Sequence, residues 1–245
     1  MNEVSGAERL VRRSRAVTVV SLALLVVLAW AWLWAGAGMG PAAMPMAGAA
    51  NRFLLTAAMW WVMMVAMMLP SAAPVILLYG RVYRHGAQAP PTSAFLGGYL
   101  AVWLAFALLA AGLQALLEQL GLVSAMALSD YWLRAGLLIA AGAYQLSPLK
   151  DACLASCRTP TDFLTRHYRP GALGALRMGL LHGAFCVGCC WLLMALLFVA
   201  GVMNLAWIAA LTLLVAAEKL LPAGQWIARL SGAVLIAWGA ASLLA

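Results

Sequence analysis

One short stretch of the chain, residues 182–190, combines an imidazole with three thiols inside an otherwise apolar run. The four groups belong to His182, Cys186, Cys189 and Cys190. On a helix with 3.6 residues per turn they lie at about 0°, 40°, −20° and 80°, so they share one face. Ionisable groups within a membrane span are costly and usually functional, and thiolate and imidazole bind soft or borderline metal ions. The pattern therefore predicts a metal site in a bilayer with these four ligands.

A second apolar segment offers thioether groups. Met59, Met63 and Met67 recur every four residues and therefore share a helical face. Thioethers favour Cu(I) over harder ions, although methionine also fills gaps in apolar cores. We predict that Met63 and Met67 contribute to the metal site or to a path toward it. Pro70 and Pro74 in the same segment should kink or break the helix near the middle of the membrane.

Depth along the apolar segments adds a carboxylate to the candidates. At 1.5 Å per residue, Met67, Cys186 and Glu218 each lie about 21–22 Å from the outer ends of their segments. Glu218 is therefore a further candidate for the metal site. The alternative is a snorkelling ion pair between Glu218 and Lys219 at the inner membrane surface.

The loop of residues 149–173 carries a separate pair of thiols, Cys153 and Cys157. A reducing cytosol disfavours a stable disulfide between them. We predict that this pair exchanges metal with the cytoplasm, with two ordinary interfacial thiols as the alternative. On the other side of the membrane, Met44 and Met46, in a loop that also contains Met39, would meet the metal, with a simple apolar loop as the alternative.

The composition indicates an integral membrane protein. Of the 245 residues, 66% are hydrophobic and 9% are charged, whereas soluble domains have about 25% charged residues. No long polar segment suggests a second domain, so we expect one all-α domain over residues 1–245. The net charge of +8 comes from basic residues in short stretches between apolar runs, which is typical of membrane orientation rather than of nucleic-acid binding.

Seven apolar segments approach the length of about 20 residues that a transmembrane helix needs. They are residues 16–37, 53–79, 94–117, 131–148, 174–201, 204–221 and 226–244. If the N-terminus is cytoplasmic, every lysine and arginine except Arg52 and Arg134 lies on the cytoplasmic side. The sequence therefore predicts a seven-helix, multi-pass protein of the bacterial inner membrane with a cytoplasmic N-terminus.

Several motifs together resemble one bacterial family, the predicted metal-binding integral membrane proteins, a domain of unknown function. The motifs are a His-x3-Cys-x2-Cys-Cys block and a Met-Met-Leu-Pro-Ser block, and the resembling segments are residues 59–74, 147–160, 182–191 and 215–219. The resemblance covers about residues 53–221. It implies a bound metal but supplies neither a substrate nor a reaction.

We therefore predict a membrane protein that binds a soft ion, with Cu(I) favoured and Zn(II) as the other ion that suits a thiolate–imidazole site. Its role would be copper handling, by transport, delivery or metalloenzyme assembly, with a metallochaperone or a membrane metalloenzyme as partner. We identify no catalytic residue. Two alternatives remain. The Cys-x2-Cys spacing of Cys186 and Cys189 is also that of a thiol–disulfide oxidoreductase, and the chain could be a structural partner in a membrane complex.

Overall fold

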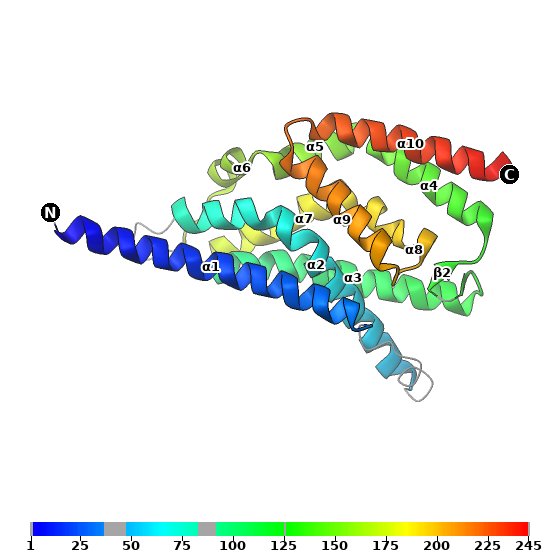
Figure 1. Cartoon of the computed structure of the whole chain (residues 1–245), viewed down its shortest axis with the longest axis horizontal. Coiled ribbons are helices and arrows are strands. Elements are labelled where there is room, and N and C mark those ends of the chain that lie inside the picture. The colour runs from blue at the N-terminus through cyan, green and yellow to red at the C-terminus, as the bar shows by residue number, and fades with distance from the viewer. Residues whose placement is uncertain (1, 37–47, 83–91, 125, 245) are drawn as a thin grey trace.

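The computed structural model describes residues 2–36, 48–82, 92–124 and 126–244 (Figure 1). This part of the chain is helical apart from a short antiparallel hairpin, β1 (Val123–Ser124) and β2 (Ala127–Leu128), so the predicted all-α class is confirmed. The helices are α1 (Asn2–Trp34), α2 (Ala49–Val82), α3 (Thr92–Gln119), α4 (Tyr131–Gln145), α5 (Pro148–Arg158), α6 (Pro160–His167), α7 (Gly171–Ala195), α8 (Leu197–Ala200), α9 (Leu205–Leu220) and α10 (Gly224–Leu244).

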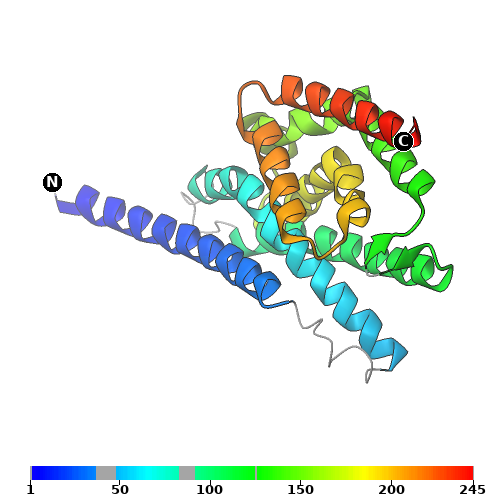
Figure 2. The same cartoon turned by 45° about the vertical axis from the view of Figure 1, so that its right-hand side comes forward.

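The long helices lie side by side, and α7 runs through the middle of the bundle (Figure 1). The most extensive packing joins α7 to α3, α4 to α10, and α2 to both α1 and α3. Short helices α5 and α6 lie at one end of the bundle (Figure 2). Other helices therefore surround α7, the helix that carries the three thiols.

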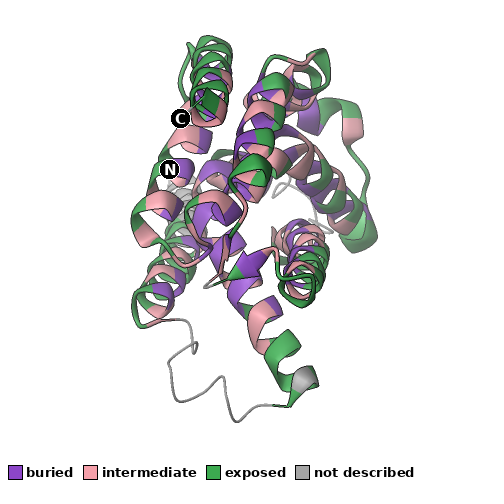
Figure 3. Cartoon of the chain, turned by 90° about the vertical axis from the view of Figure 1, so that its right-hand side faces the viewer, coloured by how far each residue is buried: buried purple, intermediate pink, exposed green. Residues whose placement is uncertain are grey.

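Large apolar side chains cover the outside of the bundle, as a lipid environment requires. Leu28, Leu109 and Leu213 are more than half exposed although they lie on three different helices. Figure 3 shows buried segments on the inner sides of the helices and exposed segments on the outer sides. Exposed leucines on this scale are typical of a surface in contact with lipid rather than with water.

Five helical segments within the described residues are long and apolar enough to cross a membrane, not the seven that the sequence predicts. They are Ala16–Trp34, Ala50–Arg81, Thr92–Gln119, Gly171–Ala200 and Gly224–Leu244. The expected spans at 131–148 and 204–221 form α4 and α9, which have 15 and 16 residues. At 1.5 Å per residue they measure roughly 22–24 Å, short of the ~30 Å hydrocarbon core.

Local capping explains why these two helices are short. The Asp130 side chain accepts a hydrogen bond from the Leu133 amide at 3.0 Å and fixes the start of α4. The Asn204 side chain does the same for α9, through the Trp207 amide at 3.2 Å. Pro148 and Pro222 stand just beyond the C-terminal ends of α4 and α9, where a proline disfavours helix continuation.

The proline-containing helix α2 is continuous through Pro70 and Pro74, so of the expected kink or break only a kink is possible. Its axis nevertheless changes direction, as Figures 1 and 2 show. Each proline removes one backbone donor, which leaves the carbonyls of Ala66 and Pro70 without their usual helical partners and permits a bend. Packing of α2 between α1 and α3 holds the helix together across this region.

Glycine allows α3 and α7 to approach closely. A Cβ atom on Gly179 would collide with the Phe95 carbonyl, and one on Gly98 would collide with the Leu176 carbonyl. A Cβ atom on Gly183 would lie 2.9 Å from the Val102 Cβ atom. Gly179 and Gly183 therefore permit the close approach of α3 and α7, because small residues let helix backbones touch in a membrane.

This contact predicts opposite effects for two neighbouring glycines of α3. Gly98→Ala should lower the free energy of unfolding by about 1–3 kcal/mol, because the methyl group forces the α3 and α7 backbones apart. Gly97→Ala is the matched control, since a Cβ atom there meets nothing within 4 Å. It should leave stability unchanged or raise it by about 0.5–1 kcal/mol. Thermal unfolding in detergent measures both, and equal effects would contradict the packing argument.

Candidate metal centre

The three thiols of α7 point into the bundle rather than toward lipid. Cys186, Cys189 and Cys190 are each 1% exposed. The thiols of Cys189 and Cys190 both donate to the Cys186 carbonyl, with Sγ–O distances of 3.1 and 2.9 Å. The Cys190 thiol is also close enough to those of Cys186 and Cys189 to interact with them. The three sulfur atoms therefore form one buried cluster on the predicted helix face.

A fourth thiol reaches this cluster from α5. The Ser147 side chain caps the start of α5 by accepting a hydrogen bond from the Lys150 amide, and Pro148 begins the helix. The helix lies against α7, and the Cys157 thiol is close enough to that of Cys189 to interact with it. The pair predicted as a separate cytoplasmic site therefore supplies a member of the α7 cluster.

The other α5 thiol, Cys153, lies over Gly188 of α7. Its Sγ atom is 2.8 Å from the position that a Gly188 Cβ atom would occupy, so only glycine leaves room for it. Burial raises the pKa of the Cys153 thiol, and the nearby Cys189 adds to the rise. For Cys157, the hydrogen bond to Cys189 raises the pKa most, and burial raises it further. Both α5 thiols therefore favour the protonated form when no metal is bound.

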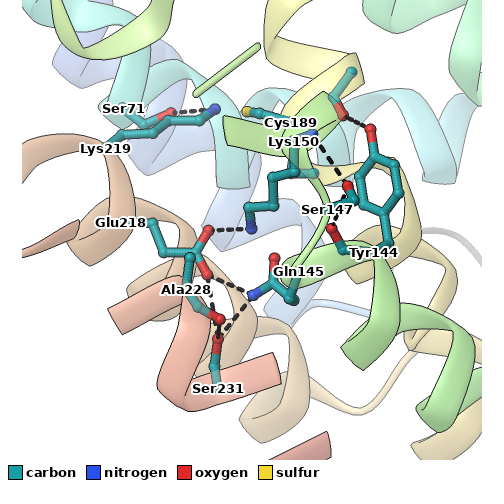
Figure 4. A network of polar contacts seen from close by, with 12 residues as sticks. Ser71, Tyr144, Gln145, Ser147, Lys150, Cys189, Glu218, Lys219, Ala228 and Ser231 are labelled. Atoms are coloured by element: carbon teal, nitrogen blue, oxygen red, sulfur yellow. Dashed lines mark hydrogen bonds and ion pairs between the residues drawn. The ribbon is translucent and has the colours of Figure 1, made fainter. Parts of the chain in front are cut away.

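A lysine lies beside the sulfur atoms. The Lys219 Nζ atom of α9 is 3.0 Å from Cys186 Sγ, 3.4 Å from Ser71 Oγ and 3.9 Å from Met68 Sδ. Figure 4 shows its side chain extended toward Ser71 and the neighbouring Cys189. The ammonium group thus has a partner for each of its three donors, and the partner nearest to it is a thiol.

Helices α2 and α3 complete the surroundings of the cluster. The Met68 Sδ atom is 3.8 Å from Cys190 Sγ, and the Tyr99 hydroxyl is 3.2 Å from Cys186 Sγ. The Tyr99 hydroxyl also donates to the Met68 carbonyl at 3.1 Å. Met63 and Met67, the two methionines predicted for the site, are fully buried on α2. The thioether that touches the cysteines is that of Met68.

His182 occupies an aromatic pocket one helical turn before Cys186. Its ring stacks against Tyr99 at a centroid distance of 5.7 Å and packs near Phe163 at 5.1 Å and Phe95 at 6.1 Å. The side chain is buried, and its Nδ1 atom has no hydrogen-bond partner among the described residues. An unpartnered buried nitrogen is rare and indicates a group whose partner is a ligand or a water molecule.

Glu218 belongs to a polar network beside the thiol cluster. Its carboxylate accepts from Lys150 Nζ at 2.6 Å and from Gln145 Nε2 at 2.6 Å, and Ser231 Oγ lies at 3.4 Å (Figure 4). The alternative of a Glu218–Lys219 pair is wrong, because Lys219 turns to the thiols while Glu218 turns to α4, α5 and α10. Consecutive residues on a helix point about 100° apart, which separates the two side chains.

The donor set of the cluster suits a soft ion. Four thiols and one thioether from α2, α5 and α7 meet in it, and such groups select Cu(I) or Zn(II) over hard cations. In the part of the chain that is described, no three His, Cys, Asp or Glu side chains are already arranged to hold an ion. Binding would therefore require the thiols to turn from their present hydrogen-bond partners. The methionines predicted to face the outside, Met39, Met44 and Met46, lie outside the described residues.

Sequence reasoning missed Lys219 and Met68 as neighbours of the thiols. A signal existed for Lys219, because a lysine in an apolar segment demands a partner. No signal separated Met68 from the other methionines of α2, since the rotation of α2 against α7 decides which thioether reaches the cysteines.

The buried ion pair generates a stability prediction. Lys150→Met should lower the free energy of unfolding by about 3–5 kcal/mol, because it leaves the Glu218 carboxylate buried without its cation. The double change Lys150→Met with Glu218→Leu should recover part of that loss, since no charge then remains unpaired. Thermal unfolding of the detergent-solubilised protein tests both, and a double variant less stable than the single one would contradict this account.

The chain was compared with known proteins. No curated protein and no solved structure matches it. A family model described as "PpoB2: Copper chaperone" matches residues 57–242, a range that includes all five cysteines, Met68 and Lys219. Because this match covers most of the sequence, the chain belongs to the PpoB2 copper chaperone family, a membership consistent with copper as its metal.

Proposed function

We propose that this protein is a membrane-embedded chaperone that binds Cu(I) in the buried thiol cluster and passes it to a membrane metalloenzyme. The observation that carries the proposal is the meeting of Cys157, Cys186, Cys189 and Cys190 with the Met68 thioether inside the bundle. The ligands would be chosen among the four thiols, with Met68 as a weaker donor. The five membrane-length apolar helices support a site within the bilayer.

The chemistry of the donors supports the monovalent ion. Cu(I) prefers thiolate and thioether sulfur, whereas Zn(II) also accepts imidazole and carboxylate. Apart from His182 and the hydroxyl groups of Tyr99 and Ser71, the described groups beside the cluster that could coordinate a metal are sulfur atoms. The Glu218 carboxylate nearby already binds Lys150 and Gln145. We therefore propose Cu(I) as the cargo and assign Glu218 to the support of the bundle.

The remaining candidates have supporting places in the proposal. His182 would serve as a further ligand in the cluster or as a transient ligand for copper as the ion leaves it. Its Nδ1 atom has no partner among the described residues and lies one turn from Cys186. Met63 and Met67 would lie on a path through the core along α2. Cys153 would exchange copper with the cytoplasm, with the N-terminus cytoplasmic and the protein in the bacterial inner membrane.

A single-atom change at the cluster tests the proposal. Cys186→Ser should weaken Cu(I) binding by about 100-fold or more, because oxygen is a poor ligand for this ion. The fold should survive, since the serine hydroxyl can accept the hydrogen bond from Lys219. Purified protein would be loaded anaerobically with Cu(I) against a chromogenic chelator, and bound copper measured by mass spectrometry. Full copper occupancy in the variant would refute the assignment of Cys186.

The choice among the methionines of α2 is tested in the same assay. Met68→Leu should weaken Cu(I) binding by roughly 10-fold, because one thioether beside Cys190 is lost. Met59→Leu is the matched control, since Met59 is equally buried on α2 and about 13 Å farther along the helix. If Met67→Leu weakens binding while Met68→Leu does not, the sequence-based choice of Met67 holds and the contact with Met68 is incidental.

A thiol–disulfide oxidoreductase is the second candidate function, and one observation favours it. Lys219 lies 3.0 Å from Cys186 Sγ, and a neighbouring cation stabilises the thiolate that redox chemistry needs. Such an enzyme would hold no stoichiometric copper and would form a titratable Cys186–Cys189 disulfide. The copper assay and a thiol titration of the same preparation distinguish the two functions.

A further inference from the structure

Three charged side chains are buried together where α5, α7 and α9 meet. Lys150, Glu218 and Lys219 have exposures of 0%, 1% and 7%. Lys150 and Glu218 neutralise each other at 2.6 Å. Lys219 is not part of that ion pair or of the other described pair, between Arg229 and Asp151. The cluster therefore contains one positive charge that no described carboxylate balances.

The groups around Lys219 indicate what balances it. Its neighbours are the Cys186 thiol, the Ser71 hydroxyl and the Met68 thioether, and of these only the thiol can become an anion. A charge buried in an apolar interior is costly unless an opposite charge accompanies it. The position of Lys219 thus favours a negative charge on the sulfur atoms of the cluster.

The oxidation state of a bound metal decides whether the complex carries that negative charge. Two thiols that lose their protons to a monovalent ion give a complex of net charge −1, which one ammonium neutralises. The same two thiolates give a neutral complex with a divalent ion, so the ammonium stays unbalanced. A divalent ion reaches −1 only when a third thiol is deprotonated as well. The buried charges therefore match the monovalent case with the fewest deprotonated thiols.

We propose that Lys219 is a specificity-determining residue, whose ammonium is the counter-charge of a two-thiolate complex and so favours monovalent Cu(I) over divalent ions such as Zn(II). This inference rests on the proposed function, because it concerns the same thiol cluster. Lys219 acts on selectivity through charge, and it does not coordinate the metal.

The test measures Cu(I) and Zn(II) affinities of the full-length protein in detergent by competition with chelators. For Lys219→Leu, the ratio of Cu(I) affinity to Zn(II) affinity should fall by about 100-fold, because a buried two-thiolate Cu(I) complex loses its counter-charge. Lys219→Arg keeps the charge and should keep most of the ratio. Arg229→Gln is the matched control, because it also removes one positive charge. That charge is on a side chain that is 52% exposed and therefore solvated by water or lipid headgroups.

Each outcome is decisive. If the ratio of Cu(I) to Zn(II) affinity is unchanged in Lys219→Leu, the proposal is overturned. This includes an equal fall of both affinities, because a merely structural lysine would affect both metals alike. If Lys219→Leu does not fold, the wild-type protein decides with Ag(I) and Cd(II), two thiophilic ions of different charge. Ag(I) should displace Cu(I) and Cd(II) should not, and equal competition would overturn the proposal. A wild-type protein that binds no Cu(I) would instead refute the proposed function.

Discussion

Glu218 and Lys219 are consecutive in α9, yet their side chains serve different parts of the structure. Glu218 accepts hydrogen bonds from α4 and α5, and Lys219 donates to α2 and α7. A buried charge in an apolar bundle must find a partner, because hydrocarbon cannot solvate it. This constraint fixes the rotation of α9 and brings α5 against α7. The meeting of the α5 and α7 thiols thus depends on two adjacent charged residues.

Close backbone packing complements these polar contacts. Gly98 and Gly179 let α3 touch α7, which brings the Tyr99 hydroxyl to Cys186 and to the Met68 carbonyl. On the other side of α7, Gly188 leaves space for the Cys153 sulfur, and the Tyr144 hydroxyl donates to the Gly188 carbonyl. Small residues of α7 therefore set the distance at which three neighbouring helices place their polar groups against α7.

Helical periodicity was sufficient to predict the parts of the site that lie on one element. The spacing of Cys186, Cys189 and Cys190 gave their common face, and apolar runs gave the all-α class. Lengths were less well predicted, although the capping residues Asp130 and Asn204 are visible in the sequence and mark where α4 and α9 begin. Hydropathy averages over such caps, so it predicts spans at 131–148 and 204–221 that are longer than α4 and α9.

Contacts between elements could not be predicted in the same way. Neither the return of α5 onto α7 nor the choice of Met68 follows from periodicity, because both depend on how the helices rotate against each other. The alternative of a Glu218–Lys219 pair fails for a local reason, since neighbouring residues on a helix diverge by about 100°. Partners for such residues must be sought on other helices. For Glu218 that partner is Lys150 of α5.

The hydrogen bonds of the thiols bear on how the copper that we propose as cargo could be released. Cys189 and Cys190 donate to the Cys186 carbonyl, Cys157 pairs with Cys189, and Cys186 accepts from Lys219. A buried polar group left without a partner costs about 1–3 kcal/mol, which would oppose release of the ion. Because each of these thiols has a protein partner, the release of copper that we propose would leave no sulfur atom of the cluster unpaired. These alternative partners are thus compatible with the proposed delivery of copper, which requires the ion to leave the cluster.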